Sequence, residues 1–564
     1  MDTNRTRVAY FSMEIALEPE IPTYSGGLGV LAGDMLRSAA DLDVPMVAVT
    51  LAHRHGYFDQ ILDESGHQSE APEPWDPSQH ADLLGPSVEI PLEGRQVRIR
   101  AWRYTIVGHK DRTIPVFLLD TDWPENTEWD RSLTDSLYGG DEHYRLCQEV
   151  VLGIGGIRLL RELGYSELAT FHMNEGHAAL LTLQLLEEKL GHPRLSEATE
   201  ADIREVRTKC VFTTHTPVPA GHDQFPRDLV EQVLGHDRLG ILDATHCCPQ
   251  SVLNMTFLAL RFSHYINGVA MHHGAVSHDM FPEYPIRAIT NGVHAETWTS
   301  PEFHALYDRH MPEWHRDNLY LRYAIGIARN EIQAAHQAAK LRLFQQVGTR
   351  AGVTLDPNVF TIGFARRATA YKRFDLLFSD PERLRKITED VGPVQILYGG
   401  MAHPKDEAGK EQIRRVYEFA AKLRSPKLKI VYLEDYRLPW AKLLTAGVDL
   451  WLNTPLRPQE ASGTSGMKAA LNGVPSLSIL DGWWIEGCLE GITGWAIGQD
   501  GEVREATAGE AESLYEKLAA ITALFYQRHD DYTHVMRGAI ALNGSFFNTQ
   551  RMLAQYVENA YVPA

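Results

Sequence analysis

The stretch Val359–Arg373 reads VFTIGFARRATAYKR, a strand-like apolar run followed by four cationic side chains within eight residues. Short runs of β-branched and aromatic residues predict a buried strand. No acidic side chain lies among the cations, and guanidinium and ammonium groups together suit phosphate oxygens. Most charge runs are solvated helix faces. The position directly after a strand nevertheless favours a ligand site, because ligands of α/β sheets bind beyond the carboxyl ends of strands.

The same alternation of apolar runs and helical patterns continues along the chain and predicts an α/β protein with parallel sheets. After Val8–Phe11, the predicted strands are Met46–Leu51, Val116–Leu119, Leu168–Met173, Val211–Thr214, Val359–Phe364, Val394–Tyr398, Lys429–Leu433, Val448–Leu452 and Ser476–Ile479. The predicted helices are Gly29–Asp41, Gln148–Leu163, His177–Lys189, Tyr320–Val347, Lys405–Leu423 and Lys468–Leu471. A cluster of Pro, Trp and His at Asn291–Arg309 marks the expected domain boundary. We therefore expect two doubly wound, Rossmann-like domains, residues 1–295 and 296–564, that face a cleft, with the last helix packing back on the first domain.

Composition excludes several classes of protein. The 564 residues carry 54 basic and 74 acidic side chains, a net charge of −20, which argues against wrapping of nucleic acid or binding to anionic membranes. Neither an export signal nor an apolar run of transmembrane length is evident. Five cysteines without paired spacing are typical of reduced thiols, so we expect a cytoplasmic protein. The histidines and cysteines of segments 246–248 and 272–278 match no usual zinc spacing, and we expect no metal site.

Other motifs leave more than one interpretation open. Ser25–Gly29 (SGGLG) precedes a helical pattern, where glycines could admit an anion or simply form a turn. Glu460–Lys468 (EASGTSGMK) fits neither a Walker A loop nor a serine nucleophile elbow. Its lysine could contact phosphate, form a Schiff base with a carbonyl cofactor, or be solvated. His177 and His215 follow predicted strands and either line an active site or are satisfied in the core.

In this order, these segments resemble the α-glucan phosphorylases, the family of glycogen, starch and maltodextrin phosphorylases. The resemblance extends from Tyr10–Glu14 (YFSME) to Asp481–Gly482, and the pattern E-A-S-G-T-x-x-M-K is highly specific. It implies a glycosyltransferase-B fold, pyridoxal 5′-phosphate as cofactor, and retaining phosphorolysis of α-1,4-glucan non-reducing ends to glucose 1-phosphate. The implied partners are α-glucan or maltodextrin and inorganic phosphate, and a homo-oligomer is compatible with the sequence.

The resemblance also implies residues for the cofactor. Lys468 corresponds to the lysine that holds pyridoxal phosphate as a Schiff base. Thr464 and Ser465 lie where the family loop touches the cofactor phosphate. Further cofactor contacts are expected at Tyr436, Arg437 and Arg366, where Arg366 replaces a residue that is often lysine in the family.

The residues implied for the substrate lie in both halves of the chain. Arg367 and Lys372 match the residues for the substrate phosphate, to which Gly26 and Gly27 would present backbone N–H groups. His215 matches the histidine near the transferred glucosyl unit. Asn291 and Glu460 match residues that are expected to bind glucose hydroxyls. Glu175 and His177 lie in the family's Asn-Asp-x-His-like segment, in which Glu175 replaces Asp.

In the implied chemistry, the substrate phosphate protonates the glycosidic oxygen beside the cofactor phosphate, and the cations offset the repulsion between the two anions. The chain is shorter than the long phosphorylases, which indicates a bacterial-type member without their N-terminal regulatory region. A glycogen-synthase-like nucleotide-sugar transferase is the nearest alternative. It uses an E-x7-E pair, whereas Lys468 stands eight positions after Glu460. A non-catalytic glucan-binding protein is the second alternative, although sugar binding alone needs neither the lysine nor the basic cluster.

Overall fold

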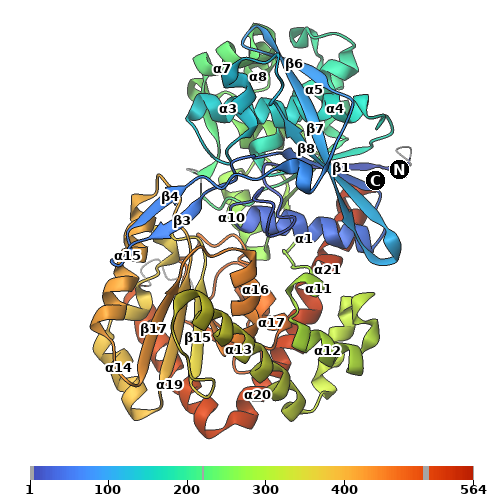
Figure 1. Ribbon diagram of the computed structural model, residues 1–564. Coiled ribbons are helices and arrows are strands. Elements are labelled where there is room, and N and C mark those ends of the chain that lie inside the picture. The colour runs from blue at the N-terminus through green and yellow to red at the C-terminus, as the bar shows by residue number, and fades with distance from the viewer. Residues whose placement is uncertain (1–4, 219–220, 499–506, 563–564) are drawn as a thin grey trace. The chain divides into compact units, whose positions relative to one another are not determined.

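A computed structural model describes residues 5–218, 221–498 and 507–562 and divides the chain into two compact units. Unit 1 contains Met1–Phe58, Pro72–Thr290 and Met552–Ala564. Unit 2 contains Asp59–Ala71 and Asn291–Arg551. Each unit has its own sheet with helices around it (Figure 1). This is the expected α/β architecture, with two sheets that are largely parallel.

The sheet of unit 1 is parallel through its centre and antiparallel at one edge. Its order is β14-β13-β10-β9-β1-β2-β8-β7-β5, in which β7 runs antiparallel to β8 and β6 also pairs with β7. The strands are β1 Val8–Ser12, β2 Met46–Leu51, β5 Asp82–Leu83, β6 Val88–Leu92, β7 Arg95–Val107, β8 Thr113–Asp120, β9 Thr170–Asn174, β10 Cys210–Thr213, β13 Tyr265–Gly268 and β14 Ile286–Ala288. A separate hairpin pairs β11 Gln224–Pro226 with β12 Val252–Asn254. The strands β1, β2, β9 and β10 are buried along their whole length, as their apolar sequences predict.

Helices cover this sheet with two apolar clusters. They are α1 Gly27–Asp41, α2 Glu128–Arg131, α3 Glu142–Val150, α4 Gly156–Glu162, α5 Leu181–Leu190, α6 Glu200–Arg207, α7 Arg227–Leu234, α8 His236–Ala244, α9 Met255–Arg261 and α10 Met271–Met280. A π-helical segment, Val151–Gly155, joins α3 to α4 within the predicted helix Gln148–Leu163. The predicted helix His177–Lys189 begins only at Leu181, because residues 176–178 form a 3-10 turn.

Residues 552–562 complete the core of unit 1 from the far end of the sequence. Helix α21, Thr549–Tyr556, brings Met552, Leu553 and Tyr556 into the apolar cluster that includes β1 and α1. The Tyr561 hydroxyl lies 2.7 Å from Nδ1 of His172. These side chains are buried and belong to the same packed layer as strands made hundreds of residues earlier.

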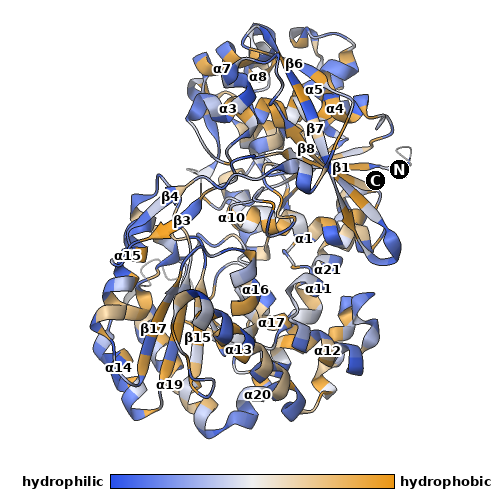
Figure 2. Cartoon of the chain, viewed as in Figure 1, coloured by the Kyte–Doolittle hydropathy of each residue, from blue (hydrophilic) through white to orange (hydrophobic). Residues whose placement is uncertain are grey.

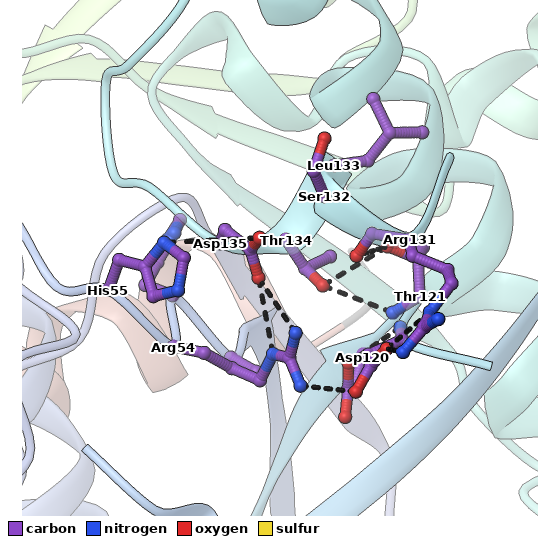
Figure 3. A network of polar contacts seen from close by, with 12 residues as sticks. Arg54, His55, Asp120, Thr121, Arg131, Ser132, Leu133, Thr134 and Asp135 are labelled. Carbon is purple, nitrogen blue, oxygen red and sulfur yellow. Dashed lines mark hydrogen bonds and ion pairs between the residues drawn. The ribbon is translucent and has the colours of Figure 1, made fainter. Parts of the chain in front are cut away.

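An ionic network fixes the loops that follow β2 and β8. Arg54 donates from Nη2 and Nε to Oδ1 of Asp135, at 3.1 and 3.2 Å, and also pairs with Asp122. Figure 3 shows Arg54 directed at Asp135, with Thr121 and Thr134 beside it. The Thr121 N–H donates to the Thr134 hydroxyl at 3.0 Å. The loops at this sheet edge are therefore tied to one another by charge-assisted hydrogen bonds.

The described strands of unit 2 form a fully parallel sheet and a short hairpin. The sheet order is β17-β16-β15-β18-β19-β20. The strands are β15 Phe360–Ala365, β16 Val394–Gly399, β17 Leu428–Leu433, β18 Leu450–Asn453, β19 Ser476–Ile479 and β20 Gly494–Ile497. The hairpin of β3 Asp59–Leu62 and β4 Gln68–Ala71 lies against this unit, where Gln60 Nε2 donates to the Gly400 carbonyl at 2.9 Å.

The helices of unit 2 are α11 Ala295–Trp298, α12 Pro301–His310, α13 Arg329–Ala351, α14 Pro381–Asp390, α15 Glu407–Lys422, α16 Leu438–Gly447, α17 Ser465–Leu471, α18 Trp484–Gly487, α19 Thr507–Gln527 and α20 His529–Gly538. The long helix predicted over Tyr320–Val347 is interrupted, because residues 318–326 form 3-10 turns before α13. A buried ion pair joins α13 to the sheet, with Lys340 Nζ 2.6 Å from Oδ2 of Asp449.

Hydropathy follows the layers. In Figure 2 the strands β15 and β17 contain orange, hydrophobic residues, whereas much of α14 and α15 is blue. Trp483 and Trp484 are 3% and 1% exposed and belong to the packed interior. Among the described residues, none of the helices combines the length and apolar character needed to cross a bilayer.

Candidate active site

Arg366 and Lys372 meet at one carboxylate in unit 2. Arg366 directly follows β15, and Lys372 ends the 3-10 turn 370–372 in the same loop. The Arg366 Nη2 and the Lys372 Nζ each donate to Oε2 of Glu460 at 2.6 Å. Burial alone would raise the pKa of the Glu460 carboxyl, but the two cations reverse this effect and hold it at about 2. Glu460 is therefore a charged, buried partner for both cations.

The N–H groups of Arg366 that do not bind Glu460 indicate a binding site for an anion. The Arg366 side chain is 10% exposed. Its Nε and Nη1 are buried and have no hydrogen-bond partner within the part of the chain that the structure describes. Buried donors without an acceptor are costly, and phosphate oxygens are strong acceptors for a guanidinium. The loop after β15 thus has the donor arrangement of a phosphate site.

The loop Glu460–Lys468 is positioned by its neighbours. The Glu460 N–H donates to Oδ2 of Asp481 at 2.9 Å, and Trp451 Nε1 donates to the Ser465 hydroxyl at 3.0 Å. Gly463 has φ +72°, and a Cβ there would lie 3.2 Å from Oε1 of Glu460. Thr464 is half-buried in front of α17. This turn requires glycine at 463, and the two residues with hydroxyl side chains, at 464 and 465, follow it directly.

Lys468 is a buried amine rather than a solvated surface lysine. The residue is 7% exposed, and its Nζ lies 3.8 Å from the centre of the Trp298 ring. The Asn472 amide donates to the carbonyl oxygens of Trp298 and Lys468, at 2.8 and 3.0 Å. A lysine that is packed against an aromatic face and largely withdrawn from water can react with a carbonyl group.

Two further members of the basic cluster differ from each other. Arg367 is exposed. Arg373 serves the fold, because its Nη1 donates to Oε2 of Glu510 at 2.6 Å and its Nε donates to the Thr454 carbonyl at 3.0 Å. The cluster of four cations therefore separates into a buried pair, an exposed arginine and a structural arginine.

Tyr436 and Arg437 follow β17. The Tyr436 ring packs on Gly399, where a Cβ would lie 3.1 Å from its Cδ2. Arg437 donates from Nε to Asp435 and from Nη2 to Asp59, both at 2.7 Å. Burial, together with Asp59, raises the pKa of Asp435 to about 6. Arg437 is thus engaged with carboxylates of unit 2, and Tyr436 is set by close packing.

Asn291 is buried at the start of unit 2. Its carbonyl oxygen accepts a hydrogen bond from Arg551 Nη2 at 2.9 Å. Its side-chain Oδ1 is buried without a partner among the described residues. An amide oxygen in this state can accept a hydrogen bond from a ligand hydroxyl.

In unit 1, the glycine loop already holds a carboxylate. Glu14 Oε2 accepts hydrogen bonds from the N–H groups of Ser25 and Gly26, at 2.6 and 3.1 Å. Its Oε1 accepts from the Tyr138 hydroxyl at 2.8 Å. In this structure the Gly26 N–H donates to Glu14, so a phosphate at this donor would displace the carboxylate, and the expected phosphate contact stays a prediction. Gly27 is exposed at the first residue of α1.

His215 lies at the carboxyl end of β10, beside residues that follow β9. Its Nε2 donates to Oδ1 of Asn174 at 2.7 Å, and its backbone N–H donates to Oε2 of Glu175 at 2.7 Å. Burial lowers the pKa of His215 to about 3, so the imidazole is neutral near pH 7. Glu175 has φ +74°, and burial raises its pKa to about 7. The sheet thus brings together polar side chains that are about forty residues apart in sequence.

His177 belongs to a buried charge network in the same unit. Its Nε2 lies 3.3 Å from Oδ2 of Asp223, which also accepts from Arg145 Nη2 at 2.9 Å. Arg145 Nε lies 3.3 Å from Oε1 of Glu149, whose pKa is raised by burial and by Asp223. Burial lowers the pKa of His177 to about 4. Its Nδ1 has no partner among the described residues and can face a ligand.

Comparison with known proteins identifies the family. The family model for carbohydrate phosphorylases matches residues 239–493. The chain is 39% identical to a maltodextrin phosphorylase of Thermococcus litoralis over 99% of its own length and 70% of that protein. It is 38% identical to a glycogen phosphorylase of Mycobacterium tuberculosis, over 99% of this chain and 71% of that protein. The chain belongs to the carbohydrate phosphorylase family.

An uncharacterised protein of Methanocaldococcus jannaschii is 30% identical over 98% of this phosphorylase and 99% of its own length.

Several residues that hold the site together were not found by sequence reasoning. Glu14 and Asp481 follow the strand patterns Val8–Phe11 and Ser476–Ile479, so the rule for polar residues at strand ends could have found both. Asp223 and Trp298 carry no such signal. They reach His177 and Lys468 only through tertiary packing, and no local pattern identifies them.

Proposed function

We propose that this phosphorylase cleaves α-1,4-glucan at its non-reducing ends with inorganic phosphate, yielding glucose 1-phosphate with retention of configuration. The observation that carries the proposal is the buried guanidinium of Arg366, which lies beside Lys372 and Glu460. Its Nε and Nη1 have no hydrogen-bond acceptor among the described residues. The names of the relatives support glucan as the second substrate. We further propose that the protein acts in the cytoplasm.

The residues of unit 2 described above fit pyridoxal 5′-phosphate. The cofactor needs a buried amine and donors for its phosphate. Lys468 supplies the amine, Thr464 and Ser465 supply hydroxyls, and Arg366 supplies unpaired donors. When bound, the cofactor contributes a phosphate group that exchanges a proton with the substrate phosphate.

The protein's own residues have separate roles in this proposal. Arg366 and Lys372 offset the negative charge of the phosphates, and Arg367, which is exposed, binds the incoming substrate phosphate. Glu460 keeps the two buried cations oriented until an anion binds. Glu460 also accepts a hydrogen bond from a glucose hydroxyl. Tyr436 and Arg437 complete the cofactor contacts. The general acid is thus a phosphate group, and no pair of protein carboxylates is needed for this step.

Two further sets of groups, one within unit 1 and one at the start of unit 2, are candidates for binding sugar hydroxyls. We assign the neutral His215, held by Asn174, to contact with the transferred glucosyl unit. His177 offers Nδ1 and Asn291 offers Oδ1 as acceptors for hydroxyl groups. Gly27 lies in the part of the glycine loop that an anion can approach without displacing Glu14. Each role is assigned from the hydrogen bonds that the group can make.

Borohydride reduction tests the cofactor assignment. We expect the purified protein to absorb in the near ultraviolet and, after reduction, to carry a pyridoxyl group on Lys468 in a peptide map. Lys468→Ala should lack the group and release no glucose 1-phosphate from maltodextrin and phosphate. Lys422→Ala, at a side chain 70% exposed on α15, is the matched control and should keep both properties. An unmodified Lys468 in the active wild-type enzyme would contradict the assignment.

A substrate comparison tests the reaction itself. Glucan chains should shorten only when phosphate is present, and Arg367→Ala should raise the KM for phosphate more than it lowers kcat. Elongation from a nucleotide-activated glucose, without dependence on phosphate, would instead support the glycogen-synthase-like alternative. Glucan binding with neither reaction would support a non-catalytic binding protein.

A further inference from the structure

Three potential metal ligands converge in unit 2, outside the site described above. His304 and Asp308 lie one turn apart on α12 and therefore on the same face of that helix. His315 ends the 3-10 turn Pro312–His315 that follows α12. One ligand atom from each of the three side chains lies within 4.8 Å of the other two. His315 Nε2 and Asp308 Oδ1 are already 2.7 Å apart.

Glu296 provides outer hydrogen bonds for both imidazoles. Nε2 of His304 lies 3.0 Å from the Glu296 carbonyl oxygen, so this nitrogen donates and Nδ1 keeps its lone pair. Nδ1 of His315 donates to Oε1 of Glu296 at 2.5 Å, and Nε2, which lies 2.7 Å from Oδ1 of Asp308, is the nitrogen that a metal ion bound to Asp308 would take. Hydrogen bonds of this kind orient the imidazoles that bind metals and select their tautomers.

The surroundings hold the ligands but leave them accessible. The wholly buried Trp314 packs against both histidines, with ring centres 4.8 Å from His304 and 4.2 Å from His315. Trp314 Nε1 also donates to Oδ1 of Asp308 at 2.9 Å. The side chains of His315 and Asp308 remain 33% and 52% exposed. A metal ion could therefore enter from solvent and meet side chains whose orientation is already restricted.

We propose that His304, Asp308 and His315 bind a divalent transition-metal ion, Zn²⁺ or a chemically similar ion such as Co²⁺. Two imidazoles and one carboxylate suit such ions, and water would complete the coordination. The ion would join α12 to the turn after it and, through Glu296, to α11. Because α11 also carries Trp298, against which Lys468 lies, the metal would stiffen one wall of the lysine environment. This is a structural role, separate from the chemistry of the proposed reaction.

Titration with Co²⁺ tests this site on the full chain after treatment with a chelator. We expect one saturable set of visible ligand-field bands that Zn²⁺ displaces. His304→Ala and His315→Ala should each abolish the bands, and Glu296→Gln should weaken affinity by roughly 10- to 100-fold. His310→Ala is the matched control. It removes an imidazole of the same helix that is paired with Glu331 at 2.9 Å, and it should leave the titration unchanged.

The variant Asp308→Asn distinguishes loss of metal binding from misfolding. Its amide oxygen can still accept a hydrogen bond from Trp314, whereas the charged metal ligand is lost. It should keep the circular dichroism spectrum of the metal-free protein and bind Co²⁺ more weakly. If the wild-type protein shows no saturable binding, or if binding survives both histidine substitutions in folded protein, the proposal is overturned. The three residues would then form only an ion-paired cluster in which His315 lies between Glu296 and Asp308.

Discussion

Glu460 balances two cations with a single carboxylate oxygen. Arg366 and Lys372 both bind Oε2, and all three side chains are almost completely buried. Removing one member of such a cluster leaves charge without compensation in the interior, which costs more than the intact cluster contributes on balance. An anion that arrives at Arg366 must share that guanidinium with Glu460. The carboxylate is thus both a structural partner and a competitor for the proposed phosphate.

Glu460→Gln should lower the free energy of unfolding by about 3–5 kcal/mol near neutral pH, because the two cations lose their counter-charge. The folded-state pKa of Glu460, about 2, lies below its ordinary value of 4.5, so the charged form is the one that stabilises the fold. The difference between wild type and variant should therefore be complete above about pH 4.5 and decrease as the pH falls toward 2. Urea unfolding over this range measures it.

Phosphate offers a second measurement on the same variant. It should stabilise Glu460→Gln more than the wild-type protein, since the two free cations bind it without competition. Glu407→Gln, at a side chain 83% exposed on α15, is the control and should match the wild type in both experiments. A stability difference that does not change with pH would contradict the assigned role of Glu460.

At the scale of single residues, the sequence identifies which charged and polar groups belong to the site but not which of them are in contact. The resemblance singles out Arg366, Lys372 and Glu460, yet it assigns Glu460 to glucose hydroxyls alone. The carboxylate reaches the two cations across 94 and 88 residues, a separation that no motif spacing encodes. Charge and burial decide the pairing only once the chain has folded.

Helix α1 shows how closely one element can approach its neighbour. The Ala16 N–H donates to the Gly29 carbonyl at 2.9 Å, and a Cβ at Gly33 would lie 2.0 Å from the Ala16 carbonyl oxygen. Glycine at 33 is therefore required by contact between two backbones rather than by the helix itself. Gly27, at the first residue of the same helix, would meet nothing within 4 Å if it carried a Cβ.

Gly33→Ala should reduce the free energy of unfolding by about 3 kcal/mol, because α1 must move away from residues 13–17. Gly27→Ala is the matched control in the same helix. It should leave stability unchanged or raise it by up to about 1 kcal/mol, since alanine is the better helix former. Equal effects of the two substitutions in chemical denaturation would rule out close backbone packing as the reason for glycine at 33.

Element type was predictable where the pattern was strongly apolar. Buried parallel strands such as Met46–Leu51 and Ser476–Ile479 have continuous hydrophobic sequences, and both were predicted with the observed bounds. Strand β7 was missed because its half-buried face alternates with arginines, from Arg95 to Arg103, and has no continuous apolar run. The break before α13 was also missed, since residues 318–326 have good helical composition but form 3-10 turns.

Over the whole molecule, buried histidines gather in unit 1. Burial lowers the pKa of each to about 3 or 4, so all are neutral when folded at pH 7. They are His53, His172, His177, His215, His222 and His273. In unit 2, the buried His336 lies 2.9 Å from the carboxylate of Asp449. The two units therefore differ in how acid acts on them.

Unit 1 should lose stability first as the pH falls from about 6.5 toward 4. Its histidines take up protons only on unfolding in this range, so each contributes a stability that decreases with the pH. Glu175 and Glu149, whose pKa values burial raises, act in the opposite sense but are fewer than these histidines. Amide exchange should show β9 and β10 opening at a higher pH than β15 and β16. Earlier loss of protection in β15 would contradict this expectation.

The assignment of residues to units was the least accessible to sequence reasoning. No local composition marks residues 59–71 as part of unit 2, because their role depends on hydrogen bonds such as Gln60 to Gly400. The composition change at Asn291–Arg309 is a local signal, whereas exchanges of short segments are decided by long-range packing.

The return of residues 552–562 into unit 1 has a consequence for biosynthesis. The ribosome makes the strands β1, β2, β9 and β10 long before Met552, Leu553 and Tyr556, which share a core with some of them. Throughout that interval the nascent chain must keep an apolar surface uncovered while residues 291–551 of unit 2 are synthesised. An apolar surface exposed in this way can bind chaperones that shield hydrophobic groups, and the need for such shielding ends when residues 552–562 pack onto unit 1.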